Sequence, residues 1–206
     1  MRVITVSRQF GSGGRELGKR LADALGFKYY DKHIIEAAAE EAKNGGIYSD
    51  SMAASTLVSL PLTFARSFSV PLISPAEMAG TLGAQHAAMK ELASLGDCVV
   101  VGRSGNVVLG DETPFRIFVY ADMDSRIARC RGRAKADEAD LTDRAYEKKI
   151  KRIDKQRTSA HRIVSDIKWG DPLGYDLCIN TTGIEIKSIV AQTAEYAKHF
   201  FENNGK

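Results

Sequence analysis

Apolar residues recur along this chain in two alternating spacings, one typical of strands and the other typical of helices. Five short runs have the β-branched, aromatic or uniformly apolar composition of strands: 3–6, 27–30, 98–101, 115–120 and 177–179. Between them, apolar residues return at the three- and four-residue intervals of amphipathic helices, as at Leu17, Leu21 and Leu25. The alternation of strand and helix predicts an α/β protein with a mostly parallel sheet and helices on both of its faces.

The same spacing predicts further helices after the second strand, at about 74–95, within the polar stretch 134–166, and from Ile186 to Ala197. Asp31 precedes the first of these, where a carboxylate caps free backbone amides; contact with a substrate is the alternative role. Residues 47–75 are rich in Ser and Thr and are interrupted by prolines. We expect them to form either a helical hairpin over the substrate or a mobile flap.

A glycine-rich loop separates the first strand from the first helix. Gly11, Gly13 and Gly14 break the chain before the helical spacing begins. Such a loop leaves backbone N–H groups free at a helix N-terminus, where the helix dipole favours an anion, and glycine allows close approach of the backbone. The arrangement predicts a phosphate-binding loop; a glycine-rich turn without a ligand is the alternative.

The loop departs from the standard pattern, which is Gly, four residues, Gly-Lys and then Ser or Thr. If Gly13 is the second glycine of that pattern, Arg8 stands at the first glycine, Gly14 at the lysine and Arg15 at the hydroxyl residue. Shifting the alignment by one residue instead places Arg15 at the lysine, again with no Ser or Thr after it. Either alignment supplies a nearby cation and no metal-binding hydroxyl.

Two further groups of basic residues are candidates for phosphate contacts. Arg103 follows the apolar run 98–101, and ligands of open α/β sheets lie at the carboxyl ends of strands. A salt bridge to a neighbouring helix is the alternative role for Arg103. Arg152 and Arg157 lie in a basic stretch that could close over a polyphosphate as a lid, although a charged surface helix has the same composition.

Composition excludes several classes of function. The 206 residues suit one sizeable domain, and a net charge of +3 from 29 basic and 26 acidic residues does not favour nucleic acid. Aromatic residues, which stack on bases, are almost absent from the basic stretch. The three cysteines lack metal-ligand spacing and are expected to be reduced core residues. We expect no metal site built from protein ligands, no leader peptide, no membrane span and a cytoplasmic location.

Several of these segments together resemble one known family. They are Ile4–Gly18 with the glycine loop, Leu25–Lys32, Val100–Gly105, Ile153–Arg157, and Trp169 to Thr181. The chain is similar over nearly its whole length to the cytidylate kinase-like family, a branch of the P-loop nucleoside monophosphate kinases. The resemblance implies a three-layer P-loop kinase fold in a single domain, 1–206, with a helical monophosphate-side insert at about 32–95 and a lid at about 131–168.

The resemblance also implies an activity, which is transfer of the γ-phosphate of ATP, with Mg²⁺, to a nucleoside monophosphate such as CMP or dCMP. The implied donor-phosphate contacts are Arg8, Gly11, Ser12, Gly13, Gly14 and Arg15. The implied acceptor contacts are Asp31, Arg103 and Ser104. The residues expected to act on the transferring group are Arg15, Arg103, Arg152 and Arg157.

The chain also departs from the family pattern. Ser104 stands where ordinary cytidylate kinases have an aspartate, the loop lacks its lysine and hydroxyl residue, and 160–164 lacks the usual tyrosines. The alternative function is therefore a catalytically weak or inactive nucleotide-binding module on the same fold.

Overall fold

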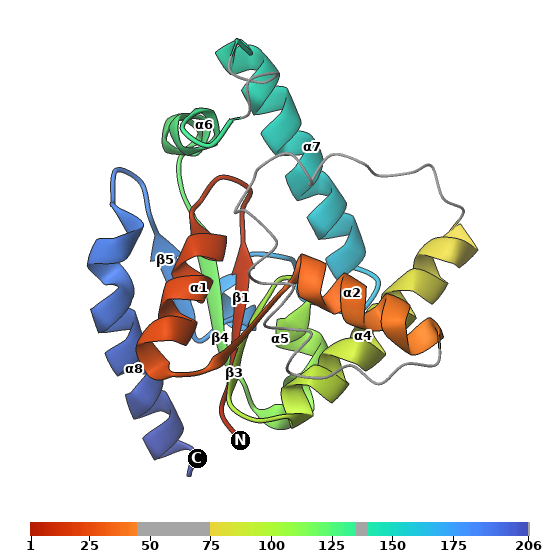
Figure 1. Cartoon of the computed structure of the whole chain (residues 1–206). Coiled ribbons are helices and arrows are strands. Elements are labelled where there is room, and N and C mark those ends of the chain that lie inside the picture. Colours follow the sequence, from red (N-terminus) through yellow and green to blue (C-terminus); the bar gives the residue numbers. More distant parts are fainter. Residues whose placement is uncertain (45–74, 135–139, 206) are drawn as a thin grey trace.

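The computed structural model of the chain describes residues 1–44, 75–134 and 140–205. Its centre is one parallel sheet with helices on both sides (Figure 1). The two chain termini lie at one end of the molecule, and the glycine loop lies toward the opposite end. The expected hairpin or flap at 47–75 falls outside the described residues except for its last position.

The sheet contains five strands in the order β2-β3-β1-β4-β5. Their bounds are β1 Val3–Arg8, β2 Lys28–Asp31, β3 Cys98–Val101, β4 Phe115–Tyr120 and β5 Leu177–Asn180. Every neighbouring pair is parallel. All four residues of β3 are buried, as its continuous apolar run predicts for a strand covered on both faces. The order places the carboxyl ends of β1 and β3 side by side, next to the glycine loop.

Seven α-helices and three short 3₁₀ helices complete the described structure. The α-helices are α1 Gly14–Leu25, α2 Lys32–Lys43, α4 Pro75–Ser94, α5 Gly105–Val108, α6 Met123–Arg131, α7 Asp143–His161 and α8 Val190–Asn203. The 3₁₀ helices are η2 Gly110–Glu112, η4 Pro172–Gly174 and η5 Ile186–Ile189. No helix in the described ranges has the length and apolar character needed to cross a membrane.

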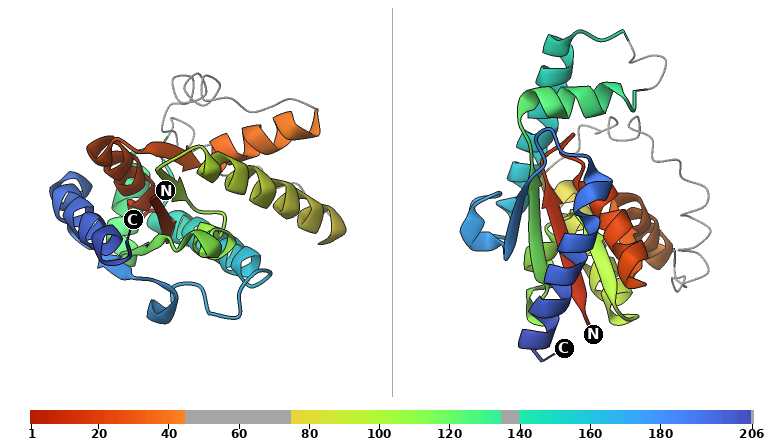
Figure 2. Two further views of the ribbon diagram at one scale, coloured as in Figure 1. Left: turned by 90° about the horizontal axis from the view of Figure 1, so that it is seen from below. Right: turned by 90° about the vertical axis from the view of Figure 1, so that its left-hand side faces the viewer.

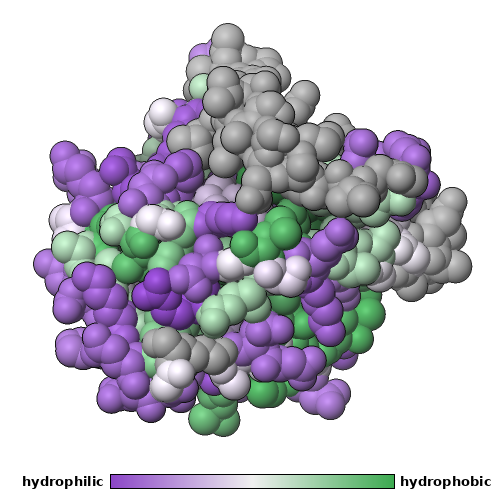
Figure 3. Space-filling model, turned by 60° about the horizontal axis from the view of Figure 1, so that its bottom comes forward, coloured by the Kyte–Doolittle hydropathy of each residue, from purple (hydrophilic) through white to green (hydrophobic). Residues whose placement is uncertain are grey.

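Helices cover both faces of the sheet (Figure 2). Helix α1 lies so close to one face that a Cβ on Gly18 would stand 2.5 Å from Val101 Cγ2. Helix α8 packs beside α1, and α5 covers the opposite face, where Gly105 lies over Thr5 and Val100. The end of the molecule that comes forward in Figure 3 is mostly hydrophilic, with scattered hydrophobic residues. The predicted α/β class and two-sided covering are confirmed.

A second, smaller core lies beneath α6 and α7. It consists of six buried residues, Phe10, Ile127, Cys130, Tyr146, Ile150 and Ile153. Phe10 belongs to the glycine loop, so this core fastens the loop to the two helices that follow β4. It explains why the polar α7 has a weak apolar stripe, because only one narrow side of that helix is buried.

Three predicted boundaries shift in the structure. The polar helix expected at 134–166 is shorter, because Thr142 caps it at its start and it ends at His161. The last α-helix begins at Val190, because Ile186–Ile189 forms a 3₁₀ turn first. The second strand is displaced by one residue from the aromatic run and includes Asp31. Local caps and turns account for each shift.

Candidate functional site

The glycine loop turns sharply between β1 and α1. Gly11 and Gly13 have φ angles of +81° and +86°, which side chains rarely adopt. A Cβ on Gly11 would also stand 2.8 Å from the Arg126 carbonyl oxygen, and one on Gly13 would stand 2.4 Å from Ile186 Cδ1. Gly13 caps α1 without a side chain, so the first amides of that helix stay open to an anion.

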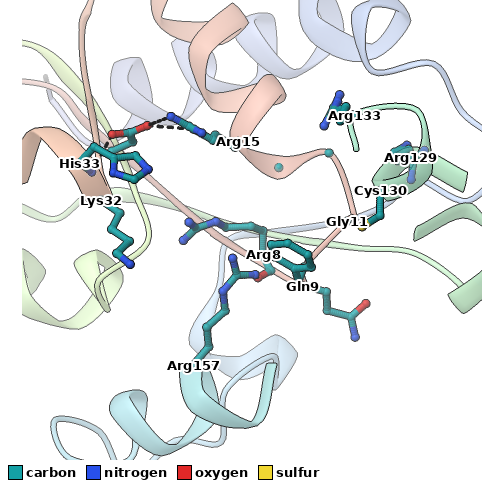
Figure 4. Close-up of a pocket in the computed structure, with 14 residues that line it drawn as sticks. Arg8, Gln9, Gly11, Arg15, Lys32, His33, Arg129, Cys130, Arg133 and Arg157 are labelled. Atoms are coloured by element: carbon teal, nitrogen blue, oxygen red, sulfur yellow. Dashed lines mark hydrogen bonds and ion pairs between the residues drawn. The ribbon is translucent and has the colours of Figure 1, made fainter. Parts of the chain in front are cut away.

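A cavity opens at this loop and is lined from β1, α1, α2, α6 and α7 (Figure 4). Six of its 14 lining residues are cationic: Arg8, Arg15, Lys32, Arg129, Arg133 and Arg157. Asp31 is the one carboxylate among these described lining residues. A cavity with this charge, next to an uncapped helix N-terminus, is suited to a polyanionic ligand.

Asp154 of α7 holds the loop from the side opposite α1. Its carboxylate accepts a hydrogen bond from the Phe10 amide at 2.8 Å and is ion-paired with Arg126. Arg126 in turn donates through Nε to the Phe10 carbonyl oxygen at 2.7 Å. Both backbone groups of Phe10 are therefore held by one buried ion pair. The sequence pattern did not single out Arg126 or Asp154, because neither stands next to the glycines.

Arg157 lies one turn further along α7 and faces the cavity. Its Nη1 donates to the Arg8 carbonyl oxygen at 2.8 Å, and its guanidinium carbon lies 5.3 Å from the centre of the Phe10 ring. Burial lowers the pKa of Arg157 well below its ordinary value; Arg8 adds to the decrease, and Asp154 at 3.6 Å opposes it. A guanidinium held this way has part of its donor set turned toward the cavity.

Arg129 and Thr181 fasten the other side of the loop. The Thr181 hydroxyl donates to the Ser12 carbonyl oxygen at 2.7 Å and also lies 3.1 Å from the Tyr120 carbonyl oxygen. Arg129 donates to the carbonyl oxygens of Thr181 and Ile184, the latter at 2.9 Å. The sequence does not predict that Arg129 and Thr181 lie at the loop, because only folding brings the segment after β5 close to it.

Asp31 organises the side of the cavity that α2 forms. Its carboxylate caps α2 by accepting from the amides of His33 at 2.9 Å and Ile34 at 3.4 Å, as expected. It also accepts from Arg15 Nε at 2.9 Å and lies 2.5 Å from Arg15 Nη2. Burial alone would lower the pKa of Arg15, but the Asp31 carboxylate offsets this and raises it.

Arg103 makes the contact that was considered as its alternative role. Its guanidinium is ion-paired with Glu36 of α2, and Lys32 Nζ lies 3.8 Å from the same carboxylate. Arg103 and Ser104 both have φ of +54°, in the turn between β3 and α5. Neither residue belongs to the lining of the cavity at the loop, although the turn that carries them borders it through Gly102 and Arg8.

The predicted site residues thus fall into two groups, those that line the cavity and those that do not. Those that line the cavity are Arg8, Gly11, Gly13, Gly14, Arg15, Asp31 and Arg157. Ser12 is buried, and its hydroxyl donates to the Gln9 carbonyl oxygen within the loop. Arg152 is exposed on α7 and is not one of the lining residues.

The cavity also includes residues to which the sequence assigned no ligand role. Arg133 lines the cavity while paired with Glu16. His33 lines it beside Asp31, and burial lowers the pKa of this imidazole. The nearby Arg131 is exposed and paired with Asp143, and it does not line the cavity.

The residues around the loop do not fit a magnesium ion held by the protein. Arg15 stands at the position of the usual hydroxyl ligand and is bound to Asp31. The described residues contain no group of three or more His, Cys, Asp or Glu side chains placed to hold a metal ion. The chain's own contribution at this loop therefore comes from its cations and backbone amides.

Comparison with solved structures shows the same fold in P-loop kinases. An uncharacterized protein from Eubacterium ventriosum ATCC 27560 superposes with a TM-score of 0.69 at 19% identity, over 96% of this chain and 99% of the other. Shikimate kinase from Bacteroides thetaiotaomicron gives 0.54 at 15% identity, over 96% and 98%. A gluconokinase from Sinorhizobium meliloti 1021 gives 0.53 at 13% identity, over 98% and 94%. At these identities the likeness shows the fold, a P-loop kinase fold.

A comparison with curated protein sequences found no match. The model of one protein family, described as the cytidylate kinase-like family, matches residues 3–183. That match includes the glycine loop, the strand ends that surround the cavity and the helix that carries Asp154 and Arg157. It covers most of the chain and agrees with the P-loop kinase fold. The chain belongs to the cytidylate kinase-like family.

Proposed function

We propose that this protein is an ATP-dependent phosphotransferase whose acceptor is a nucleoside monophosphate of the CMP or dCMP type. The observation that carries the proposal is the cavity at the glycine loop, where six cationic side chains and one carboxylate surround an uncapped helix N-terminus. Phosphoryl transfer relies on positioning and on neutralising spreading negative charge, more than on a strong base. The cavity offers both.

In this proposal the two substrates enter from different sides of the cavity. The donor phosphates bind the backbone amides from Gly11 to Arg15, and Arg157 approaches the transferring group from α7. The acceptor lies toward α2, near Asp31 and the turn with Arg103 and Ser104. Its phosphate replaces Glu36 as the partner of Arg103, which requires the ion pair seen here to open.

The proposed domain parts follow from the same division. The segment from about 32 to 95 forms the acceptor side, and the segment from about 131 to 168 forms the lid that excludes water during transfer. We propose ATP with Mg²⁺ as the donor, with the ion supplied on the nucleotide, because the described loop residues do not fit it. A cytoplasmic location, where ATP is available, belongs to the same proposal.

A coupled assay with ATP and Mg²⁺ tests the activity. The acceptors are CMP, dCMP, UMP, AMP and GMP, together with shikimate and gluconate, because structural neighbours carry the names of kinases for those two compounds. We expect diphosphate formation from CMP or dCMP. Arg157→Ala should lower kcat by about 100-fold or more, since it removes a cation from the transferring group.

Arg144→Ala is the matched control, because Arg144 is an exposed arginine of α7 that does not line the cavity. It should transfer phosphate at the wild-type rate. Folded protein that binds ATP but transfers phosphate to none of the five monophosphates would overturn the monophosphate-kinase proposal. Transfer to shikimate or gluconate alone would overturn the acceptor while keeping a kinase.

Two observations favour a second candidate, a nucleotide-binding module without robust catalysis. The loop lacks the hydroxyl ligand, and the arginine proposed for the acceptor phosphate is already paired with Glu36. Such a module would bind ATP in calorimetry with no diphosphate formed from any acceptor. Turnover with any acceptor at or above about 1 s⁻¹, within the usual range of enzymes, would exclude it.

A further inference from the structure

Compared with the standard pattern, the glycine loop of this chain has one glycine and one cation in swapped positions. The standard pattern has glycine at its first position and lysine directly after its second glycine. This chain has Arg8 at the first position and Gly14 at the lysine position. The structure shows that these two positions face each other across the start of the loop.

Only one of the two positions has room for a side chain. A Cβ on Gly14 would stand 2.5 Å from Arg8 Cβ, closer than real Cβ atoms approach, and would also lie 3.0 Å from Arg8 Cγ and 3.2 Å from Val119 Cβ. Gly14 is the first residue of α1, so the required glycine reflects space and not a left-handed backbone. A cation at position 8 therefore excludes a lysine at position 14, and the reverse holds as well.

A second glycine makes room for the far end of Arg8. Gly102 follows β3 with a φ of +88°, and a Cβ built on it would stand 1.9 Å from Arg8 Nη1. The side chain of Arg8 thus runs from the loop, past Gly14, to the carboxyl end of the neighbouring strand. Its guanidinium projects into the space between Arg15, Lys32 and Arg157 (Figure 4).

Arg8 differs from the other cations of the cavity, each of which has a close polar partner among the described residues. Arg15 is bound to Asp31, Arg133 to Glu16, Arg157 to Asp154 and the loop, Arg129 to two carbonyl oxygens, and Lys32 lies near Glu36. Within 1–44, 75–134 and 140–205, the Arg8 guanidinium has no hydrogen bond or ion pair, although Asp31 attracts it at longer range. Burial lowers its pKa to about 10, so it stays positive at neutral pH.

We propose that Arg8, the last residue of β1, replaces the missing loop lysine and binds the terminal phosphates of the nucleotide donor. This inference rests on the proposed function and names one residue in it. Arg15, the other candidate in the sequence, is committed to Asp31 and instead braces the acceptor side. Arginine presents a planar fork of donors, so it contacts two phosphate oxygens where lysine supplies a point charge.

Calorimetry with ATP and with inorganic tripolyphosphate, alongside the coupled assay, tests the proposal. Arg8→Ala should weaken binding of both probes by about 30-fold or more, the scale of a lost charge-assisted contact. Arg8→Lys should lose less, because the charge remains. Arg15→Ala should leave tripolyphosphate binding within about threefold of wild type, and Arg144→Ala is the surface-arginine control.

A reciprocal swap makes the test specific. Arg8→Gly together with Gly14→Lys restores the first glycine and the lysine of the standard pattern, and we expect this double variant to recover most of the affinity that Arg8→Gly loses. Gly14→Lys alone should bind poorly, because its side chain collides with Arg8. Circular dichroism and the melting temperature show whether each variant is folded.

The outcomes separate the two proposals. Wild-type protein that binds neither probe overturns the proposed function and this inference with it. Wild-type protein that binds and transfers phosphate, with folded Arg8→Ala doing the same at equal affinity, overturns only the role of Arg8. Loss in Arg15→Ala as large as in Arg8→Ala would move the role to Arg15.

Discussion

The carboxylate of Asp154 shows how much of the loop depends on one residue outside it. It accepts from the Phe10 amide and is paired with Arg126, whose side chain is 7% exposed. Removing one partner of such a buried pair leaves an uncompensated charge, which costs far more than the pair itself contributes. The loop shape is therefore sensitive to a position on α7 that is distant in sequence.

We predict that Asp154→Ala lowers the free energy of unfolding by about 3 kcal/mol, because Arg126 is left buried without its partner. Denaturant unfolding followed by circular dichroism measures this. The control is Asp143→Ala, since Asp143 is 70% exposed and pairs with exposed Arg131; it should cost less than about 1 kcal/mol. Equal losses in the two variants would contradict a special role for the buried pair.

Arg8 should affect stability in the opposite direction. An unpaired, half-buried cation costs folding free energy, so Arg8→Met is expected to raise the free energy of unfolding by about 1 kcal/mol at neutral pH. Chemical denaturation at neutral pH measures the difference. A purely structural arginine would show a loss on replacement, which is the contradicting result.

The pH dependence of that difference follows from the lowered pKa of Arg8. The pKa of Arg8 in the folded protein is about 10, below the ordinary arginine value that applies to the unfolded chain. The cost of the buried charge is therefore fully present below pH 10 and is relieved as the pH rises above it. We expect the gain from Arg8→Met to shrink above pH 10, while binding of tripolyphosphate by wild type weakens over the same range.

At the scale of single elements, the start of α2 combines a helix cap with a wall of the cavity. Asp31 caps the helix, binds Arg15 and lines the cavity at once. An asparagine caps a helix about as well as an aspartate does, whereas alanine costs about 1 kcal/mol. The two substitutions therefore separate the cap from the ion pair.

We predict that Asp31→Ala destabilises the protein by about 1 kcal/mol more than Asp31→Asn. If Asp31 also contacts the acceptor, both variants should raise the acceptor KM and leave the ATP KM nearly unchanged. Steady-state kinetics with each substrate varied in turn, together with denaturant unfolding, gives both quantities. An acceptor KM unchanged in Asp31→Asn would leave Asp31 with the cap and the ion pair alone.

At the scale of the whole molecule, the fold gathers like charges from distant segments into one cavity. Its cations come from β1, α1, α2, α6, the turn after α6, and α7, while the net charge of the chain is only +3. Without an anion these cations repel one another, and a bound polyphosphate relieves the repulsion. Ligand and salt should therefore act on stability in a linked way.

We predict that tripolyphosphate at 100 times its dissociation constant stabilises the protein by about 2.7 kcal/mol, as binding linkage requires. If the ligand is then held at the concentration chosen in low salt, the gain should fall as NaCl rises, because salt screens the attraction and raises the dissociation constant. Without ligand, moderate NaCl should raise the melting temperature slightly. Differential scanning calorimetry across a salt series checks both trends; a ligand effect independent of salt would contradict the electrostatic account.

The sequence by itself determined the strands, most helices and the position of the glycine loop between the first strand and the first helix. Apolar runs such as 98–101 became buried strands, because a segment covered on both faces has only apolar positions to offer. The family motifs, read together, identified the family that the comparison shows. Helix ends were less predictable, since caps such as Thr142 and the turn at Ile186–Ile189 decide them locally.

Only the tertiary structure decided which of the cationic side chains are paired with a carboxylate and which are available to a ligand. The sequence offered Arg8 and Arg15 equally as the cation of the loop; folding brings Asp31 to Arg15, and brings Gly14 and Gly102 to Arg8. Folding likewise pairs Arg103 with the carboxylate of Glu36 and brings the Asp154 carboxylate within hydrogen-bond distance of the Phe10 amide. These pairings join residues that are far apart in the sequence. A periodic pattern of apolar residues carries information only about neighbours one or two turns away, so it cannot predict such pairings.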